Sequence, residues 1–181
     1  MFAGKSSYMR NEIERRRLAR KKCIILKHSA DVRFGQERER VMLITHAGYE
    51  YSNVNIIQSD SIGTVSAELM KYDVIGIDEV QFFPDCVETI QALANLGKIV
   101  VCAGLDGNYM GKNFGRVHEL IPLAEEVIKL KAVCMKSAEC EEDASFTARI
   151  EQNDDREIDI GGLDKYVAAC RKCMWGKSNA E

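Results

Sequence analysis

Apolar residues occur in this chain in two arrangements that alternate through residues 6–133. Short, mostly apolar runs predict buried β-strands, and longer stretches with helical spacing or composition predict helices. The predicted strands are residues 23–27, 53–58, 74–77, 98–103 and 127–133. The predicted helices are residues 6–22, 65–72, 86–96 and 117–126. Gly97 is expected to end the third helix, and Pro122 predicts a break in the fourth. Strands that are apolar on both faces and alternate with helices indicate an α/β fold with a parallel sheet.

The pattern changes after residue 133. Cysteines cluster there, residues 139–143 are acidic, residues 152–157 are polar, and the regular periodicity fades. We therefore expect two parts, an α/β domain over residues 1–133 and a small separate lobe over residues 134–181.

Composition narrows the class of protein. The chain has 181 residues, of which 46% are hydrophobic and 29% charged, as in ordinary globular proteins. The formal net charge of −3 disfavours a dedicated nucleic-acid or membrane-surface binder, so the basic run at residues 15–22 is expected to be a solvated helix face. The sequence shows no transmembrane stretch and no signal peptide, and its seven cysteines suit metal-ligating thiols in a reducing compartment. We therefore expect a cytoplasmic protein.

Gly4, Lys5 and Ser6 precede the first predicted helix. In a phosphate-binding loop, backbone N–H groups cradle the phosphates, the lysine reaches the terminal phosphates and the serine hydroxyl binds Mg²⁺. The full pattern needs an earlier glycine and a strand, which would both lie before Met1. The tripeptide alone is common in proteins, and by itself it favours a helix N-terminus that carries an exposed lysine.

Two further groups of polar residues follow predicted strands. Asp78 and Glu79 end residues 74–77, where the aspartate could hold Mg²⁺ and the glutamate could accept a proton from an attacking hydroxyl. The alternative is a pair of solvated carboxylates. Asp31 and Arg33 follow residues 23–27 and should emerge at the same edge of the sheet, where Arg33 either neutralises phosphoryl charge or forms a surface ion pair.

Four cysteines in the small lobe form two pairs, Cys134 with Cys140 and Cys170 with Cys173. Four thiolates suit tetrahedral Zn²⁺, which would stabilise a lobe too small for a core of its own, and the alternative is four free thiols. The second pair has the usual two-residue spacing, whereas the first pair is wider than usual. The other cysteines, Cys23, Cys86 and Cys102, lie in apolar patterns and are expected in the core.

Five segments resemble one family in order along the chain. They are MFAGKS, DEVQFFPD, AGLDGNYMGKNFG, PLAEEVIKLKAVC and IGGLDKYVAACRKC. The chain thereby resembles the cytosolic, zinc-containing type II thymidine kinases over nearly its whole length. The resemblance departs at three points: the first strand would precede Met1, the first cysteine pair is spaced by five residues instead of two, and Tyr109 replaces the more usual phenylalanine.

The resemblance implies a P-loop (RecA-like) parallel sheet flanked by helices, with a zinc-ribbon-like C-terminal lobe. It implies transfer of the γ-phosphate of ATP to the 5′-hydroxyl of thymidine, with deoxyuridine as a further substrate, to give dTMP for DNA synthesis. The implied cofactors are ATP, Mg²⁺ and structural Zn²⁺. The implied assembly is a homotetramer or homodimer that dTTP inhibits and that binds neither nucleic acid nor membrane.

The resemblance also implies roles for individual residues. Glu79 would be the general base, and Ser6 and Asp78 would hold Mg²⁺. The implied ATP and phosphate contacts are Met1, Phe2, Ala3, Gly4, Lys5, Ser6, Ser7, Asp31, Arg33 and Gln81. The implied thymidine contacts are Phe82, Leu105, Tyr109, Phe114, Thr147, Glu157, Ile158, Asp159, Ile160, Gly161 and Tyr166. The implied zinc ligands are Cys134, Cys140, Cys170 and Cys173.

Three other interpretations stay open from the sequence. One is a P-loop ATPase whose zinc ribbon binds nucleic acid, a second is a catalytically inactive kinase fold with a binding role, and a third is a kinase for another nucleoside.

Overall fold

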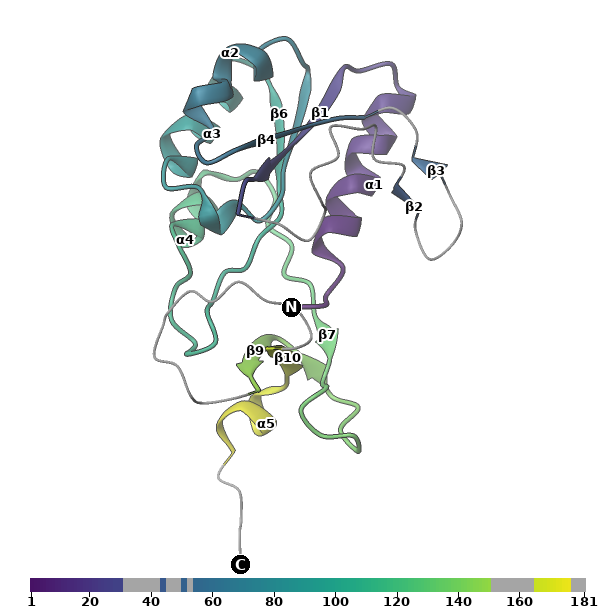
Figure 1. The fold of residues 1–181 in the computed structure, drawn as a ribbon, viewed down its shortest axis with the longest axis vertical. Coiled ribbons are helices and arrows are strands. Elements are labelled where there is room, and N and C mark those ends of the chain that lie inside the picture. The colour runs from purple at the N-terminus through teal and green to yellow at the C-terminus, as the bar shows by residue number, and fades with distance from the viewer. Residues whose placement is uncertain (31–42, 45–49, 52–53, 151–164, 177–181) are drawn as a thin grey trace, which may run out of the picture.

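A four-stranded parallel sheet forms the centre of the molecule, in the order β4-β1-β5-β6. The computed structural model describes residues 1–30, 43–44, 50–51, 54–150 and 165–176 (Figure 1). The strands of the sheet are β4 (Asn55–Ser59), β1 (Cys23–His28), β5 (Val74–Ile77) and β6 (Ile99–Cys102). The helices around it are α1 (Lys5–Leu18), α2 (Ser66–Leu69), α3 (Cys86–Asn95) and α4 (Val117–Leu120), with the 3₁₀ turns η1 (Gly63–Val65), η2 (Val80–Phe82) and η3 (Ile121–Leu123). The predicted α/β fold is confirmed.

Helices cover both faces of the sheet, as its apolar strands predict. α1 lies on one face, and α2 and α3 lie on the other (Figure 1). Alternate residues of β1 separate the two cores: Ile24 and Leu26 belong to the cluster that includes Leu93 of α3, whereas Ile25 packs with Met9 and Ile13 of α1.

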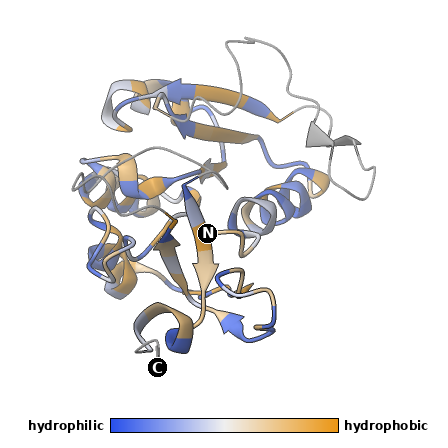
Figure 2. Cartoon of the chain, turned by 60° about the horizontal axis from the view of Figure 1, so that its bottom comes forward, coloured by the Kyte–Doolittle hydropathy of each residue, from blue (hydrophilic) through white to orange (hydrophobic). Residues whose placement is uncertain are grey.

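α1 packs against the sheet at a glycine of β5. A Cβ on Gly76 of β5 would lie 2.2 Å from Ile13 Cδ1, so a side chain at residue 76 would require the Ile13 side chain to move. Only Met9 and Ile13 of this helix are buried, and much of α1 is hydrophilic (Figure 2). Because α1 contributes little apolar surface, its position depends on this narrow contact.

The small lobe lies beneath the core and is built from short antiparallel pairs and one helix (Figure 1). β7 (Ala132–Val133) pairs with β8 (Asp143–Ala144), β9 (Phe146–Arg149) pairs with β10 (Tyr166–Ala169), and α5 (Arg171–Trp175) follows. A further pair, β2 (Leu43–Ile44) with β3 (Glu50–Tyr51), was not predicted. None of the helices in the described part of the chain is both long enough and apolar enough to cross a bilayer.

Two sequence predictions about the fold are wrong. Residues 127–133 were expected to form a strand, but only Ala132 and Val133 do so, and residues 124–129 are exposed. Apolar residues alone do not make a strand when no neighbouring strand completes the hydrogen bonds. Cys102 was expected in the core but is exposed, since β6 is the edge strand of the described sheet, whereas Cys23 and Cys86 are buried as predicted.

Asp85 fastens the loop before η1 to the start of α3. Its carboxylate accepts hydrogen bonds from the Gly63 N–H at 2.7 Å, the Ser61 hydroxyl at 2.8 Å and the Ile62 N–H at 3.2 Å. Burial works to raise the pKa of Asp85, but these three donors outweigh it, so the pKa is lowered from its usual value. The folded state therefore favours the ionised carboxylate.

Replacing Asp85 with alanine should lower the free energy of unfolding by about 2 kcal/mol at pH 7, because hydrogen bonds to a charged group are lost. A carboxylate whose pKa is lowered on folding contributes stability above its unfolded pKa of about 3.9, and that stability is lost as the pH falls through the folded pKa. Urea denaturation should therefore show a difference between wild type and variant that shrinks in acid. Asp60→Ala, at an exposed neighbour, is the control; an equal loss in both variants would contradict the assignment.

Candidate functional site

The helix N-terminus and the end of β5 meet at the carboxyl edge of the sheet. Gly4 has a φ of 75°, the left-handed conformation that lets the chain turn into α1. The Ser6 hydroxyl donates to Asp78 Oδ1 at 2.9 Å. The predicted magnesium ligands, which are 72 residues apart in the chain, are thus brought together.

Asp78 is buried beside the first turn of α1, where it accepts the Ser6 hydroxyl. The side chain is 4% exposed, and burial raises the pKa of Asp78. The Ser6 hydrogen bond opposes that shift, Glu79 adds to it, and the positive charges of Lys27 and Arg10 oppose it. Lys27 is itself buried, and sequence reasoning passed over it because it continues the apolar run of β1. The net result is a pKa above the usual value of an aspartate, because burial outweighs the hydrogen bond and the two positive charges.

Glu79 adopts a strained backbone conformation. Its φ of 51° and ψ of 47° are left-handed, which is uncommon for a residue other than glycine. The turn is held by the Glu79 N–H, which donates to Asp78 Oδ1 at 3.1 Å, and by the Val80 N–H, which donates to the Ala103 carbonyl at 3.0 Å. Strain of this kind persists only where the surroundings fix it, and it is typical of functional sites.

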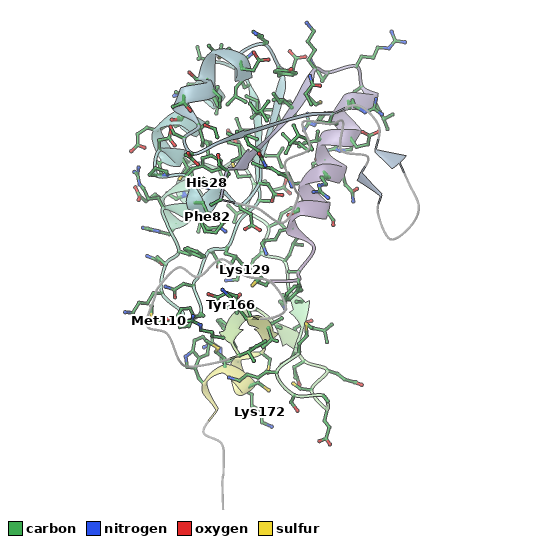
Figure 3. All side chains as sticks on the ribbon, in the orientation of Figure 1. His28, Phe82, Met110, Lys129, Tyr166 and Lys172 are labelled. Carbon is green, nitrogen blue, oxygen red and sulfur yellow. The ribbon has the colours of Figure 1, made fainter. Side chains whose placement is uncertain are left out.

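Residues 104–115 form a segment here called the substrate loop. Hydrogen bonds within the segment hold its conformation. Asn108 is buried, and its Oδ1 accepts the N–H groups of Met110 and Lys112, each at 3.0 Å. A β-bridge joins Gly107 and Asn113. The tip of the loop lies toward the small lobe: Met110 is labelled there in Figure 3, and the Tyr109 ring lies beside that of Tyr166 in β10.

A cavity of about 190 Å³ lies between the core, the substrate loop and the lobe. Among the predicted contacts, Met1, Ala3, Lys5, Leu105 and Thr147 line it. The Met1 amino group donates to Thr147 Oγ1 at 3.0 Å, which joins the first residues to the lobe. The cavity is open to both the predicted phosphate residues and the predicted thymidine residues.

The predicted aromatic contacts form two groups near this cavity. Phe82 and Phe114 meet edge to face with centroids 5.7 Å apart, and Tyr109 and Tyr166 lie 6.3 Å apart at 42°. Of the other predicted residues, Phe2 and Ser7 are exposed. The predictions that fall outside the described residues are Asp31, Arg33, Glu157, Ile158, Asp159, Ile160 and Gly161.

Several residues at this site were missed in the sequence. The Arg149 guanidinium lies 5.3 Å from the centroid of the Tyr109 ring, and Arg149 pairs opposite Tyr166 across β9 and β10. Trp175, the one tryptophan of the chain, packs so closely on the substrate loop that a Cβ on Gly111 would lie 2.8 Å from its Cζ2. Arg149 could have been identified only from the register of β9 against β10, which places it opposite Tyr166, and the sequence does not reveal that register.

His28, the last residue of β1, is a further residue near this site. Its ring packs against Phe82 at 5.6 Å and Phe83 at 4.9 Å, and its Nδ1 accepts the Ala30 N–H at 3.1 Å (Figure 3). No motif in the sequence singles out this isolated histidine.

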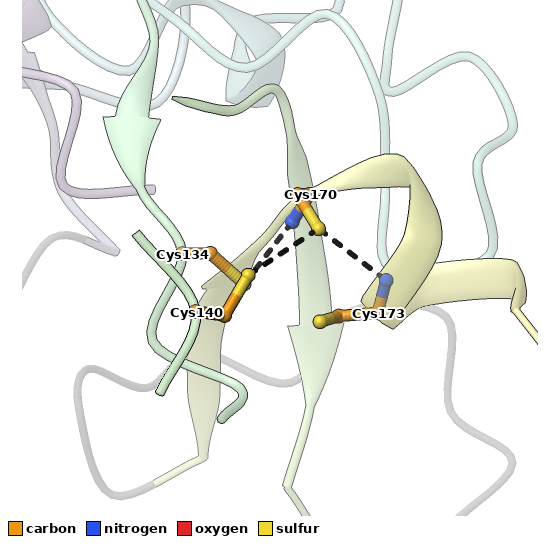
Figure 4. Close-up of side chains that lie close together, drawn as sticks. All are labelled: Cys134, Cys140, Cys170 and Cys173. Atoms are coloured by element: carbon orange, nitrogen blue, oxygen red, sulfur yellow. Dashed lines mark hydrogen bonds between the residues drawn. The ribbon is translucent and has the colours of Figure 1, made fainter. Parts of the chain in front are cut away.

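The four lobe cysteines converge on one point. Their sulfur atoms all lie within 4.8 Å of one another, and Cys140 is included despite the wide spacing of the first pair (Figure 4). Residues 135–139 form a longer turn that brings Cys140 back beside Cys134, and the Cys140 N–H donates to the Ser137 carbonyl at 3.1 Å within it. The sequence spacing was therefore a poor guide to whether Cys140 could reach a metal.

The chemistry of the cluster fits a thiophilic cation. Burial works to raise the pKa of Cys134, but the N–H groups of Cys170 and Lys136 lower it to about 7. The neighbouring Cys170 and Cys140 sulfurs raise the pKa of Cys173 to about 12. Four thiolates can share this space only when a cation balances them, and Zn²⁺ with four thiolates is the common solution.

Comparison with known proteins identifies close relatives of this chain. The family model described as Thymidine kinase matches residues 1–174. The chain is similar to Thymidine kinase 1 of Dictyostelium discoideum, with 42% identity over 179 residues, covering 99% of this chain and 76% of that protein. It is also similar to Thymidine kinase of Vaccinia virus (strain Ankara), with 42% identity over 97% of this chain and 93% of that protein. Thymidine kinase of Sheeppox virus (strain KS-1) is 40% identical over 97% of this chain and 92% of its own length.

Proposed function

The chain belongs to the thymidine kinase family and phosphorylates thymidine with ATP, and we propose that the transfer takes place where Ser6, Asp78 and Glu79 meet beside the cavity. The observation that carries this proposal is the 2.9 Å hydrogen bond between Ser6 and Asp78, with Glu79 next in the chain. Phosphoryl transfer needs a phosphate cradle, a metal site and a proton acceptor within one small volume. We propose that Lys5 and the N-terminus of α1 form the cradle, that Ser6 and Asp78 form the metal site, and that Glu79 is the proton acceptor.

Each residue then has a defined task. Lys5 opposes the charge on the transferring phosphoryl group, and the N-terminus of α1 receives the phosphates. Ser6 and Asp78 would hold Mg²⁺, which when bound neutralises charge on the phosphate oxygens. Glu79 accepts the proton of the thymidine 5′-hydroxyl as the oxygen attacks the γ-phosphorus, and ADP leaves. The proton ends on the Glu79 carboxylate, and the bond to the β-phosphate bridging oxygen breaks.

The base-recognition side of the cavity is proposed from the aromatic residues and the lobe. Tyr109, Phe82, Phe114 and Tyr166 offer rings for stacking, while Leu105 and Thr147 line the cavity. Residues 157–161, which lie outside the described part, are proposed to bond the base edge through their backbone. An unmade hydrogen bond at a buried site costs about 1–3 kcal/mol, enough to separate pyrimidines from purines.

The test of the function is an ATP-dependent phosphorylation assay with four nucleosides. We expect transfer to thymidine, weaker transfer to deoxyuridine, and little to deoxycytidine or deoxyguanosine. DNA-stimulated ATP hydrolysis without thymidine phosphorylation would favour the nucleic-acid-binding ATPase, and no transfer to any nucleoside would favour an inactive kinase fold.

Tyr109 provides a test of base stacking. Replacing it with leucine should raise the thymidine KM about 3- to 10-fold, because an aromatic contact contributes about 0.5–1.5 kcal/mol beyond its buried area. Tyr109→Phe keeps the ring and should leave KM within about 2-fold of wild type. Steady-state kinetics with saturating ATP measure both. An equal rise in the two variants would show that the hydroxyl, not the ring, makes the contact.

Four further proposals concern the domain boundaries, the oligomeric state, the ligands and the location of the protein. We propose that residues 1–133 form the nucleotide-binding domain and residues 134–181 the zinc-binding lobe with its base-binding segment. We also propose a homodimer or homotetramer, inhibition by dTTP, and no binding to nucleic acid. The thiol cluster suits a reducing compartment, which supports a cytoplasmic location.

A further inference from the structure

The side-chain amide of Gln81 lies between Glu79 and the substrate loop. Gln81 lies in η2, two residues after Glu79, and its side chain is only 5% exposed. Its Nε2 donates to Glu79 Oε2 at 2.7 Å, and its Oε1 accepts the Leu105 N–H at 3.0 Å. Both ends of the amide are therefore occupied by protein, one by the proposed base and one by the substrate loop.

The orientation of this amide follows from its partners. A backbone N–H can only donate, so the Leu105 N–H requires the carbonyl oxygen of Gln81 on its side. The NH₂ group must then face Glu79, whose carboxylate accepts it. Because donation to an ionised carboxylate is directional and roughly twice as strong as a neutral hydrogen bond, it fixes the direction of the Glu79 side chain.

Both ends of the substrate loop close onto the same residue. A Cβ on Gly104 would lie 2.7 Å from Gln81 Oε1, and a Cβ on Gly115 would lie 2.2 Å from the Gln81 carbonyl oxygen. Gly115 also has a φ of 55°. Glycine at these two positions lets the loop approach Gln81 to a distance that no side chain would allow.

This contact connects base recognition to the chemical step. The substrate loop carries Tyr109 and Phe114, and Phe114 meets Phe82 beside Gln81 in η2. A shift of the loop would move the Leu105 N–H and with it the amide that holds Glu79. A carboxylate misdirected by about 1 Å can cost on the order of 100-fold in rate.

We propose that Gln81 is a positioning residue that couples the seating of the substrate loop to the orientation of Glu79, and that it acts through Glu79 instead of contacting ATP. This inference rests on the proposed role of Glu79 as the base. It replaces the phosphate contact that the family resemblance implies for Gln81, because the described contacts of the amide are with Glu79 and Leu105.

The test is a double-mutant cycle between Gln81 and Glu79 in the full chain. Gln81→Met, which has similar size and no hydrogen bonds to offer, should lower kcat about 10- to 100-fold and leave KM for ATP and thymidine within about 3-fold. In a Glu79→Gln background the same change should lower kcat less than about 3-fold further, because the group that Gln81 positions is already gone. Gln91→Met, on the exposed face of α3, is the matched control and should behave as wild type.

A second variant keeps the test decisive if Gln81→Met does not fold. Gln81→Asn keeps a neutral amide but shortens the side chain by one methylene, so it cannot donate to Glu79 and accept the Leu105 N–H at once; it should lower kcat by about 10-fold or more, with a smaller loss of melting temperature than Gln81→Met. A raised KM for ATP with unchanged kcat would overturn the proposal in favour of a phosphate contact. Additive effects in the cycle would also overturn it. Near-normal activity of Glu79→Gln alone would instead remove the proposed base, so the two failures are distinguishable.

Discussion

Replacing Glu79 with glutamine should lower the turnover of thymidine about 100-fold or more while thymidine binding stays largely intact. The substitution keeps the size and shape of the side chain but leaves no carboxylate to accept the 5′-hydroxyl proton. General-base catalysis contributes about 100- to 10,000-fold in comparable reactions, so the loss should fall within that range. Turnover comes from steady-state kinetics, and thymidine affinity from calorimetry.

Two controls make the Glu79 result specific. Glu126→Gln, at an exposed position in the segment after η3, removes a carboxylate of the same kind away from the site and should leave kcat unchanged. A thermal melt should show that Glu79→Gln stays folded, since the backbone bonds of the turn do not involve its side chain. Turnover of Glu79→Gln within about 3-fold of wild type would exclude Glu79 as the base.

Removing one thiolate of the lobe should release the metal and unfold the lobe. Its apolar cluster contains only alanines and cysteines among its buried residues, so little hydrophobic surface holds it together. Binding of structural Zn²⁺ contributes about 10–16 kcal/mol in small domains, which is comparable with the whole stability of a typical protein. We expect about one zinc per chain in wild type and almost none in Cys170→Ser, as measured by mass spectrometry of the metal.

Loss of the metal in Cys170→Ser should also disturb the proposed thymidine site. Cys170 follows directly after β10, and the Met135 N–H donates to the Ala168 carbonyl of that strand at 2.8 Å. Tyr166, at the other end of β10, faces Tyr109. Hydrogen exchange should therefore speed up across β9 and β10 in Cys170→Ser, and KM for thymidine should rise.

Matched cysteine variants separate the metal site from general thiol effects. Cys102→Ser changes an exposed thiol on β6 and should keep the full zinc content. Cys140→Ser should lose zinc as Cys170→Ser does, because its sulfur lies within the same cluster despite the wide spacing in sequence. Full zinc content and a folded lobe in both Cys140→Ser and Cys170→Ser would contradict the four-thiolate site.

The elements best predicted from sequence are those whose residues are apolar on every side. β1 and β5 were each located to within a residue because buried strands of a parallel sheet need apolar side chains on both faces. α3 and its end at Gly97, which has a φ of 79°, were equally clear. The extent of β7 was not, because a strand also needs a partner, and the pattern does not say which segment provides one.

Some residues of the candidate site could be predicted from the sequence and others could not. Asp78 and Glu79 could be singled out because carboxylates directly after a buried strand emerge at the ligand edge of the sheet. Gln81 was singled out too, through the family resemblance, but with a different role. Lys27, His28 and Arg149 carry no local signal, since their importance comes from neighbours that are distant in the chain.

The sequence by itself therefore determined the alternation of strands and helices, the family, and the chemical types of residue available for phosphoryl transfer and metal binding. These properties are local, because they depend on side-chain polarity and on the short-range spacing of residues. The tertiary structure alone decided that Cys140 joins the other three thiols, that Ser6 reaches Asp78, and that Gln81 links Glu79 to the substrate loop. Each of these contacts depends on the path of the chain between distant residues, which is set by sheet register, turn geometry and close approaches at glycine.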